Sequence, residues 1–235
     1  MKIYFSLDKI NGKININLCQ LFNVEGIFLT YSVTDLDTAK TAIIETANFL
    51  NSQGWTPATS SNFSQRLDYN YCAITVSGKH KGKLTPDDIM VVDLEGKPQD
   101  GKKPSAETLL HTSLYAWDKS INAVLHTHSS NSTLISLITD KSSWHLEGYE
   151  LQKAFQGVDT HETVVEIPIF ENTQDIGSLA EEVINYLQRG IPCWAYLIRG
   201  HGVYAWGEDM ATALRHLEAI EYLMQCELEL MRLRK

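Results

Sequence analysis

The feature that most constrains the fold is an irregular alternation of short β-type runs with amphipathic helical segments. The β-type runs cover residues 71–78, 89–96, 123–128 and 164–170, and a glycine-containing hairpin follows at 194–207. Apolar residues at the helical repeat predict a helix from Thr34 that ends before Gly54, and further helices over 105–118, around 179–187 and over 208–232. Because some runs are joined by hairpins and others through helices, the pattern predicts one mixed or antiparallel sheet covered by helices.

Three segments are less regular. Residues 56–67 are rich in turn-forming residues and predict a loop, and residues 145–155 predict a short helix. Residues 1–31 show no sustained period, so an extra strand pair and a loose extension both remain open for them. We expect an N-terminal extension of unknown role over 1–31 and one domain over 32–235, since 235 residues suffice for a single core.

Charge and composition narrow the class of protein. The formal net charge of -9 argues against binding the phosphate backbone of nucleic acids. No run approaches the roughly 18 apolar residues that span a bilayer, and no signal-peptide pattern opens the chain. The four cysteines form no CxxC pair, as expected for a reducing cytoplasm. We therefore expect a soluble cytoplasmic protein without a membrane or nucleic-acid partner.

The strongest chemical signal is the pair His126 and His128. Residues two apart on a strand point to the same face, so both imidazoles can bind one ion, although such a pair alone is more often incidental. His201 lies between Gly200 and Gly202, where the chain turns with little steric crowding. Three histidines leave a coordination position open, as in catalytic zinc sites. The remaining histidines lack such pairing and are expected in surface or core roles: His80, His111, His145, His161 and His216.

A metal that polarises a carbonyl makes the adjacent C–H acidic, and such a site needs a base. Glu107 and Glu150 are the candidates. Glu107 could equally be an acidic residue that stabilises the first turn of a helix. Glu150 could equally lie on a solvated surface beside Lys153. Spacing alone does not rank them above Glu147 or Glu171.

Small polar loops form a third feature. Loop amides, hydroxyls and a helix N-terminus can hold a phosphate, although each loop alone is more often just a turn. The loops are Thr59–Asn62, Ser77–Gly78 and Pro104–Ala106, with Lys79, Lys81 and Lys83 adding positive charge nearby. No Walker loop and no GxGxxG motif supports nucleotide binding.

In their order, these motifs resemble those of the class II aldolase and adducin-head family. The matching segments are TSSN (59–62), SG (77–78), PSAE (104–107), HTH (126–128) and GHG (200–202), and the likeness covers about Thr34 to Leu230. The resemblance implies a three-layer α/β/α sandwich with a central, mainly antiparallel mixed sheet. It also implies a homotetramer with sites near the subunit interfaces. Ser61 departs from the family pattern, which has glycine there.

By this resemblance, His126, His128 and His201 bind one Zn²⁺ per subunit, or another divalent ion. Glu150 takes the position of the acid/base glutamate, and Glu107 that of the carboxylate before the metal strand. Asn62, Ser77, Gly78 and Ser105 fall where the family binds the phosphate of a sugar-phosphate substrate.

Within the family, the segments KPSAETLLHTSLY, AVLHTHS, EGYELQKAF, IPIFENT and IRGHGVYAWG are most similar to the branch that dehydrates 5-methylthioribulose 1-phosphate in methionine salvage. The expected activity is therefore that of a hydro-lyase. One alternative is a sugar-phosphate aldolase or pentulose-phosphate 4-epimerase of the same fold. A second is a noncatalytic interaction module like the adducin head, which would not need intact metal ligands.

Overall fold

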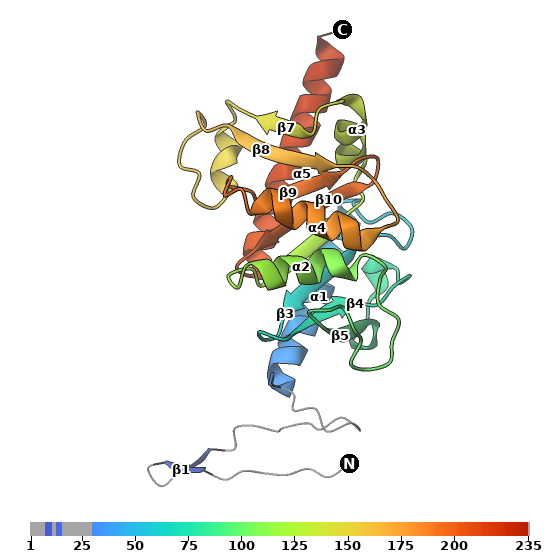
Figure 1. Cartoon of the computed structure of the whole chain (residues 1–235), viewed down its shortest axis with the longest axis vertical. Coiled ribbons are helices and arrows are strands. Elements are labelled where there is room, and N and C mark those ends of the chain that lie inside the picture. The colour runs from blue at the N-terminus through green and yellow to red at the C-terminus, as the bar shows by residue number, and fades with distance from the viewer. Residues whose placement is uncertain (1–7, 11–12, 16–29, 235) are drawn as a thin grey trace.

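The structure, a computed structural model, describes residues 8–10, 13–15 and 30–234. Eight strands form one sheet in the order β5-β4-β3-β6-β10-β9-β8-β7 (Figure 1). Every neighbouring pair is antiparallel except β8 and β9, which run parallel. The strands are β3 (Asn62–Arg66), β4 (Tyr71–Thr75), β5 (Ile89–Asp93), β6 (Ala123–Thr127), β7 (Ser143–Leu146), β8 (Val165–Phe170), β9 (Ala195–Ile198) and β10 (Gly202–Gly207). The predicted mainly antiparallel mixed sheet is confirmed.

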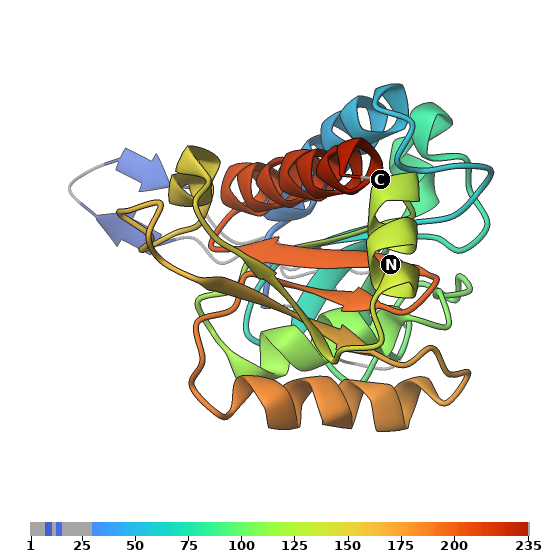
Figure 2. The ribbon, with the colours of Figure 1, turned by 90° about the horizontal axis from the view of Figure 1, so that it is seen from above.

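Helices cover both faces of the sheet, which gives three layers (Figure 2). One face carries α1 (Val33–Ser52), α3 (Ser130–Ile138) and α5 (Met210–Leu233), and the other carries α2 (Thr108–Trp117) and α4 (Ile176–Leu187). Short 3-10 turns complete the chain: η1 (Lys81–Lys83), η2 (Pro86–Asp88) and η3 (Glu150–Ala154). The expected α/β/α sandwich is therefore confirmed.

Two apolar cores lie between the layers, and alternation along the strands separates them. Leu125 of β6 packs in the core under α1 and α5, while its neighbour Val124 packs in the core under α2 and α4. His126 follows on the same face as Val124, because successive side chains of a strand alternate. The register of β6 thus directs His126 toward the α2 side of the sheet.

The structure corrects two sequence predictions. The predicted loop 56–67 contains β3, where polar residues such as Asn62 and Ser64 are buried and so conceal the strand pattern. The predicted helix 145–155 is instead the end of β7 followed by η3. Gly148 interrupts this segment with a φ of 80°, a conformation that an α-helix does not contain.

At the N-terminus, β1 (Asp8–Ile10) and β2 (Lys13–Asn15) pair antiparallel. The rest of residues 1–29 lies outside the described residues, and most of the predicted extension lies there with it. Among the described helices, none combines the length and the hydropathy that a bilayer crossing requires.

Candidate metal centre

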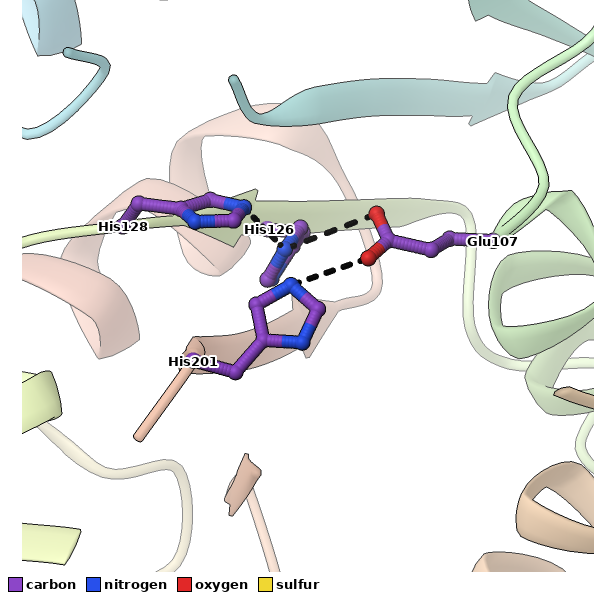
Figure 3. A group of neighbouring side chains, drawn as sticks. All are labelled: Glu107, His126, His128 and His201. Carbon is purple, nitrogen blue, oxygen red and sulfur yellow. Dashed lines mark hydrogen bonds and ion pairs between the residues drawn. The ribbon is translucent and has the colours of Figure 1, made fainter. Parts of the chain in front are cut away.

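Four side chains from three parts of the chain meet beside the end of β6. His126 lies on β6, His128 directly follows that strand, His201 lies in the β9–β10 turn, and Glu107 directly precedes α2. Their nearest ligand atoms all lie within 4.8 Å of one another (Figure 3). The Nε2 atoms of His126 and His128 are 2.9 Å apart, and Nε2 of His201 lies 2.9 Å from Oε1 of Glu107. We call these four residues the histidine cluster.

Glycine lets the β9–β10 turn close against β6. A Cβ atom on Gly202 would lie 2.1 Å from the backbone oxygen of Thr127 and 3.0 Å from Cε1 of His126. Gly200 has a φ of 65°, which side-chain-bearing residues rarely adopt. The two glycines thus permit the close approach that brings His201 to the pair on β6.

The protonation of His126 and His128 suits a cation. Nδ1 of His126 donates to the backbone oxygen of Val203 at 3.0 Å, so the lone pair of Nε2 faces the cluster. Burial holds the pKa of His126 well below its usual range and lowers the pKa of His128 to about 4. Neutral imidazoles are the form that binds divalent ions, so the cluster could hold a metal.

Glu107 completes the cluster as a carboxylate. Its burial alone would raise the pKa of the carboxyl group. Hydrogen bonds from His201 and Asn62 outweigh burial and lower the pKa of Glu107 below the ordinary value. Nδ2 of Asn62 lies 2.7 Å from Oε2 of Glu107. Glu107 therefore supplies negative charge next to three imidazoles.

A cavity of about 170 Å³ opens beside the cluster, with Glu107 and His128 in its wall. The candidate phosphate-binding residues Asn62, Ser77, Gly78 and Ser105 all line it. Its other lining residues are Thr59, Ser60, Ser61, Thr75 and Val76, so the described part of the wall contains hydroxyls and amides but no lysine or arginine. We call this space the polar cavity.

Lys81 places a positive charge behind the wall of the polar cavity. Its side chain is 1% exposed, and its Nζ donates to the backbone oxygens of Lys79 at 2.7 Å and Thr59 at 3.3 Å. These contacts join the two loops that form the cavity. Burial lowers the pKa of Lys81 to about 8, which still leaves it mostly protonated at neutral pH.

Serine at position 61, where the family pattern has glycine, is compatible with the glycine-type conformation of the loop. Ser61 adopts a φ of 73°, in the left-handed region that glycine enters most easily. The serine thus takes the backbone conformation expected of a glycine.

Comparison with known proteins identifies the family. The profile of the Class II Aldolase and Adducin N-terminal domain family matches residues 41–228. The chain belongs to this family. Methylthioribulose-1-phosphate dehydratase of Marinobacter nauticus is 53% identical over 207 residues, covering 87% of this chain and 100% of that protein. The Pseudomonas aeruginosa protein of the same name is 55% identical over 192 residues, covering 81% and 94%.

Solved class II aldolase structures share the fold. L-fuculose-1-phosphate aldolase from Thermus thermophilus superposes with a TM-score of 0.69 at 26% identity, covering 86% of this chain and 96% of that one. A second L-fuculose 1-phosphate aldolase superposes with a TM-score of 0.71 at 22% identity, covering 87% and 90%. The family's sandwich is thus retained across this identity range.

Glu150, the other candidate carboxylate, is not among the residues that the structure brings together. Its side chain is 73% exposed and lies 2.7 Å from Nζ of Lys153 and 3.8 Å from Nδ1 of His161. The hydrogen bond from Lys153 lowers the pKa of Glu150. Figure 2 shows η3 (gold) and α3 (yellow-green), which begins just after His128, at opposite ends of the sheet.

One residue beside the cluster was not singled out from the sequence. His111 is fully buried, and its ring contacts the side chain of Asn62, which in turn contacts Glu107. The sequence does carry a signal, because His111 follows Glu107 by four residues and so falls on the same face of a helix. A surface or core role was expected for it, and its burial places it in the core.

Proposed function

We propose that this class II aldolase family member is a zinc-dependent methylthioribulose-1-phosphate dehydratase. It would convert 5-methylthioribulose 1-phosphate to 5-methylthio-2,3-dioxopentyl phosphate in methionine salvage. The observation that carries the proposal is that Glu107 and His128 belong both to the histidine cluster and to the wall of the polar cavity. The identity of 53–55% with relatives of that name selects the dehydration among the reactions of the fold.

His126, His128 and His201 are the residues that would hold the ion, one per subunit. Three imidazole nitrogen donors with a position left for substrate suit Zn²⁺ in a catalytic site, although other divalent ions also accept imidazole. A bound divalent ion would polarise the C2 carbonyl of the substrate and so acidify the proton at C3.

The polar cavity would hold the phosphate. Hydroxyl and amide groups of Ser77, Gly78 and Ser105 are available there, while both ends of the Asn62 side chain already have partners. Lys81, behind the wall, offsets part of the phosphate's negative charge. In this proposal Asn62 forms part of the wall of the site, and Lys81 balances part of the charge of the phosphate.

Two carboxylates would act on the sugar. Glu150 removes the proton from C3, and the acid so formed returns a proton to the hydroxyl leaving C4, which departs as water. The resulting enol ketonises to the 2,3-diketone. Glu107, ionised beside the imidazoles, accepts a hydrogen bond from a substrate hydroxyl. Because Glu150 lies on the surface of its own subunit, we propose that it acts in the site of a neighbouring subunit.

A homotetramer would allow this arrangement. Exposed apolar side chains gather on α3, with Leu134 41%, Leu137 57% and Ile138 50% exposed. Leu134 and Ile138 also line a groove of about 570 Å³ with Leu228 and Met231 of α5. Such a patch is typical of a protein–protein contact. Light scattering should give four times the 26.5 kDa mass of the chain, and a monomer would remove the basis for sharing Glu150.

We further propose that residues 32–235 form one catalytic unit, with residues 1–31 as an extension outside it. The family match over 41–228 supports this division. A cytoplasmic location is also proposed, supported by free thiols at Cys72, Cys193 and Cys226.

One assay separates the proposed reaction from its rivals. The zinc-loaded protein is incubated with 5-methylthioribulose 1-phosphate, and the product should be lighter than the substrate by one water. Release of dihydroxyacetone phosphate from fuculose 1-phosphate would favour the aldolase, which the likeness to the Thermus enzyme makes the second candidate. Conversion of ribulose 5-phosphate to xylulose 5-phosphate would favour an epimerase. A protein that neither binds metal nor converts any substrate would be an interaction module.

A further inference from the structure

A row of buried polar side chains leads from the histidine cluster into the core. Asn62 contacts Glu107 at 2.7 Å and also contacts Nε2 of His111. Nδ1 of His111 lies 2.7 Å from Oγ of Ser64, which lies 2.8 Å from the hydroxyl of Tyr115. Ser64, His111 and Tyr115 are fully buried, and Asn62 is 4% exposed. We call these four residues the polar row.

The chemistry of each group fixes the direction of these hydrogen bonds. A carboxylate only accepts, so the amide nitrogen of Asn62 faces Glu107 and its carbonyl oxygen faces His111. Nε2 of His111 must then carry the proton. Burial lowers the pKa of His111 to about 3, so the ring is neutral and its Nδ1 accepts from Ser64. Ser64 in turn accepts from Tyr115, and every donor in the row points toward Glu107.

Two secondary-structure periodicities bring the row together. Asn62 and Ser64 are two residues apart on β3, and therefore point to the same face of the sheet. His111 and Tyr115 are four apart on α2, which packs over that face, and Glu107 precedes them by a further four residues. The row thus links α2 to β3 at the point where Glu107 enters the cluster.

We infer that His111 is a positioning residue that orients the Glu107 carboxylate through Asn62. An Asn side chain can present either its oxygen or its nitrogen to a neighbour, and an oxygen facing Glu107 would repel it. The Nε2 proton of His111 selects the orientation in which nitrogen faces Glu107. This inference rests on the proposed function, because it assigns His111 to the same reaction.

The test is a double-mutant cycle on turnover of 5-methylthioribulose 1-phosphate. His111→Phe keeps an aromatic ring but removes both nitrogens, so the Asn62 amide is free to turn over. Loss of such an outer partner lowers activity by about 10- to 100-fold, and we expect this in kcat, with KM and the zinc content near those of the wild type. When Asn62→Ala has already cut the link, adding His111→Phe should lower kcat by less than about twofold.

Matched controls separate positioning from general stability. His216 is also a buried histidine with backbone partners, Trp206 and Gln156, but it lies outside the polar row. His216→Phe should therefore leave kcat unchanged even if it lowers the melting temperature. Ser64→Ala removes the donor to Nδ1 and should lower kcat in the same direction as His111→Phe, without adding to it.

Each outcome decides the inference. A His111→Phe protein with wild-type kcat would overturn it, and so would effects of His111→Phe and Asn62→Ala that multiply fully. If His111→Phe does not fold, the cycle of Ser64→Ala with Asn62→Ala is judged by the same criterion. A wild type without turnover overturns the proposed function and the inference together, whereas a fully active wild type with an equally active His111→Phe variant overturns the inference alone.

Discussion

The histidine cluster and the surroundings of Glu150 differ in almost every physical respect. All four residues of the cluster belong to one chain, and His126 is fully buried. Strand register and the glycines of the β9–β10 turn determine which side chains meet in the cluster. Glu150 lies on a short 3-10 turn, 73% exposed, with Lys153 and His161 beside it. The residues that could hold a cation thus all come from one chain, whereas the proposed role of Glu150 would require a second chain.

The largest effect is expected from breaking the cluster. His126→Ala should remove the metal and lower turnover at least about a thousandfold, because polarisation of the carbonyl is worth several kcal/mol. Metal analysis and kcat measure both consequences. His145, which is exposed, provides the control, and His145→Ala should leave both values unchanged. A His126→Ala protein that keeps its metal and its activity would contradict the assignment.

Glu150→Gln tests whether the exposed Glu150 acts as the general base. Losing a general base should lower kcat by about 10²- to 10⁴-fold, with the metal content unaffected. Glu147→Gln is the matched control, since Glu147 is exposed on the same segment. Near-wild-type turnover of Glu150→Gln would remove Glu150 from the mechanism.

Mixing two inactive variants then shows where Glu150 acts. Tetramers reassembled from Glu150→Gln and His126→Ala subunits contain some sites with an intact cluster from one subunit and an intact Glu150 from its neighbour. About a quarter of the sites should be of this kind, so activity should reappear if Glu150 is shared. Continued inactivity of the mixture would place Glu150 in the site of its own subunit.

Glu221 tests the packing behind the cluster. It is 1% exposed on α5 and lies 3.3 Å from Nδ2 of Asn131, and burial raises its pKa to about 7. The pKa of Glu221 is higher in the folded than in the unfolded protein. The contribution of Glu221 to stability is therefore most favourable in acid and becomes less favourable as the pH rises from about 4.5 to about 7. Glu221→Gln should therefore stabilise the protein at pH 8 by about 2 to 3 kcal/mol and much less near pH 5.

Denaturant titration of the Glu221→Gln protein at both pH values measures this difference. Glu218→Gln, at an exposed position of the same helix, is the control. Equal stabilisation of the Glu221→Gln protein at pH 5 and pH 8 would mean that the carboxylate is not buried as described.

Lys81 tests the polar cavity next to the cluster. Lys81→Met keeps the length of the side chain but removes the positive charge behind the wall, so KM for the sugar phosphate should rise about tenfold. The effect should be on KM more than on kcat, since the reacting carbons lie at the cluster. Lys83→Met, at an exposed lysine of the same turn, should change KM little. Equal effects of both variants on KM would show that Lys81 contributes only to the overall charge of the protein.

The smallest effect is expected at Ser61. Ser61→Gly removes the cost of a left-handed conformation but adds freedom to the unfolded chain, so the free energy of unfolding should rise by no more than about 1 kcal/mol. Thermal unfolding measures the change. A marked loss of stability would show that the Ser61 hydroxyl, rather than the backbone conformation, maintains the loop.

The two regions also differ in how far the sequence predicts them. The spacing of His126 and His128 indicates the alternation of a strand, and the glycines around His201 indicate a tight turn. The strand β3 is concealed, because Asn62 and Ser64 are buried polar residues whose partners, Glu107, His111 and Tyr115, lie far along the chain. No local pattern contains that information.

Other elements are missed for related reasons. Helix α3 exposes Leu134, Leu137 and Ile138, so its apolar residues do not mark a single buried face. Glu150 matches the family pattern by its position in the chain, but in the proposed arrangement its place relative to the cluster would depend on assembly, which a single sequence does not encode. The strand alternation at His126 and His128 and the turn at His201 are thus predictable from the sequence, whereas long-range polar contacts and subunit contacts require coordinates.

X-ray absorption at the zinc edge measures whether His126, His128 and His201 bind one divalent ion. The zinc-loaded protein should show three imidazole nitrogens at about 2.0 to 2.1 Å, with the remaining coordination from oxygen. His126→Ala, with the same amount of zinc added, should lose this signal. A wild-type spectrum with sulfur ligands, or with a shell of oxygen alone, would show that the three imidazoles do not hold the ion.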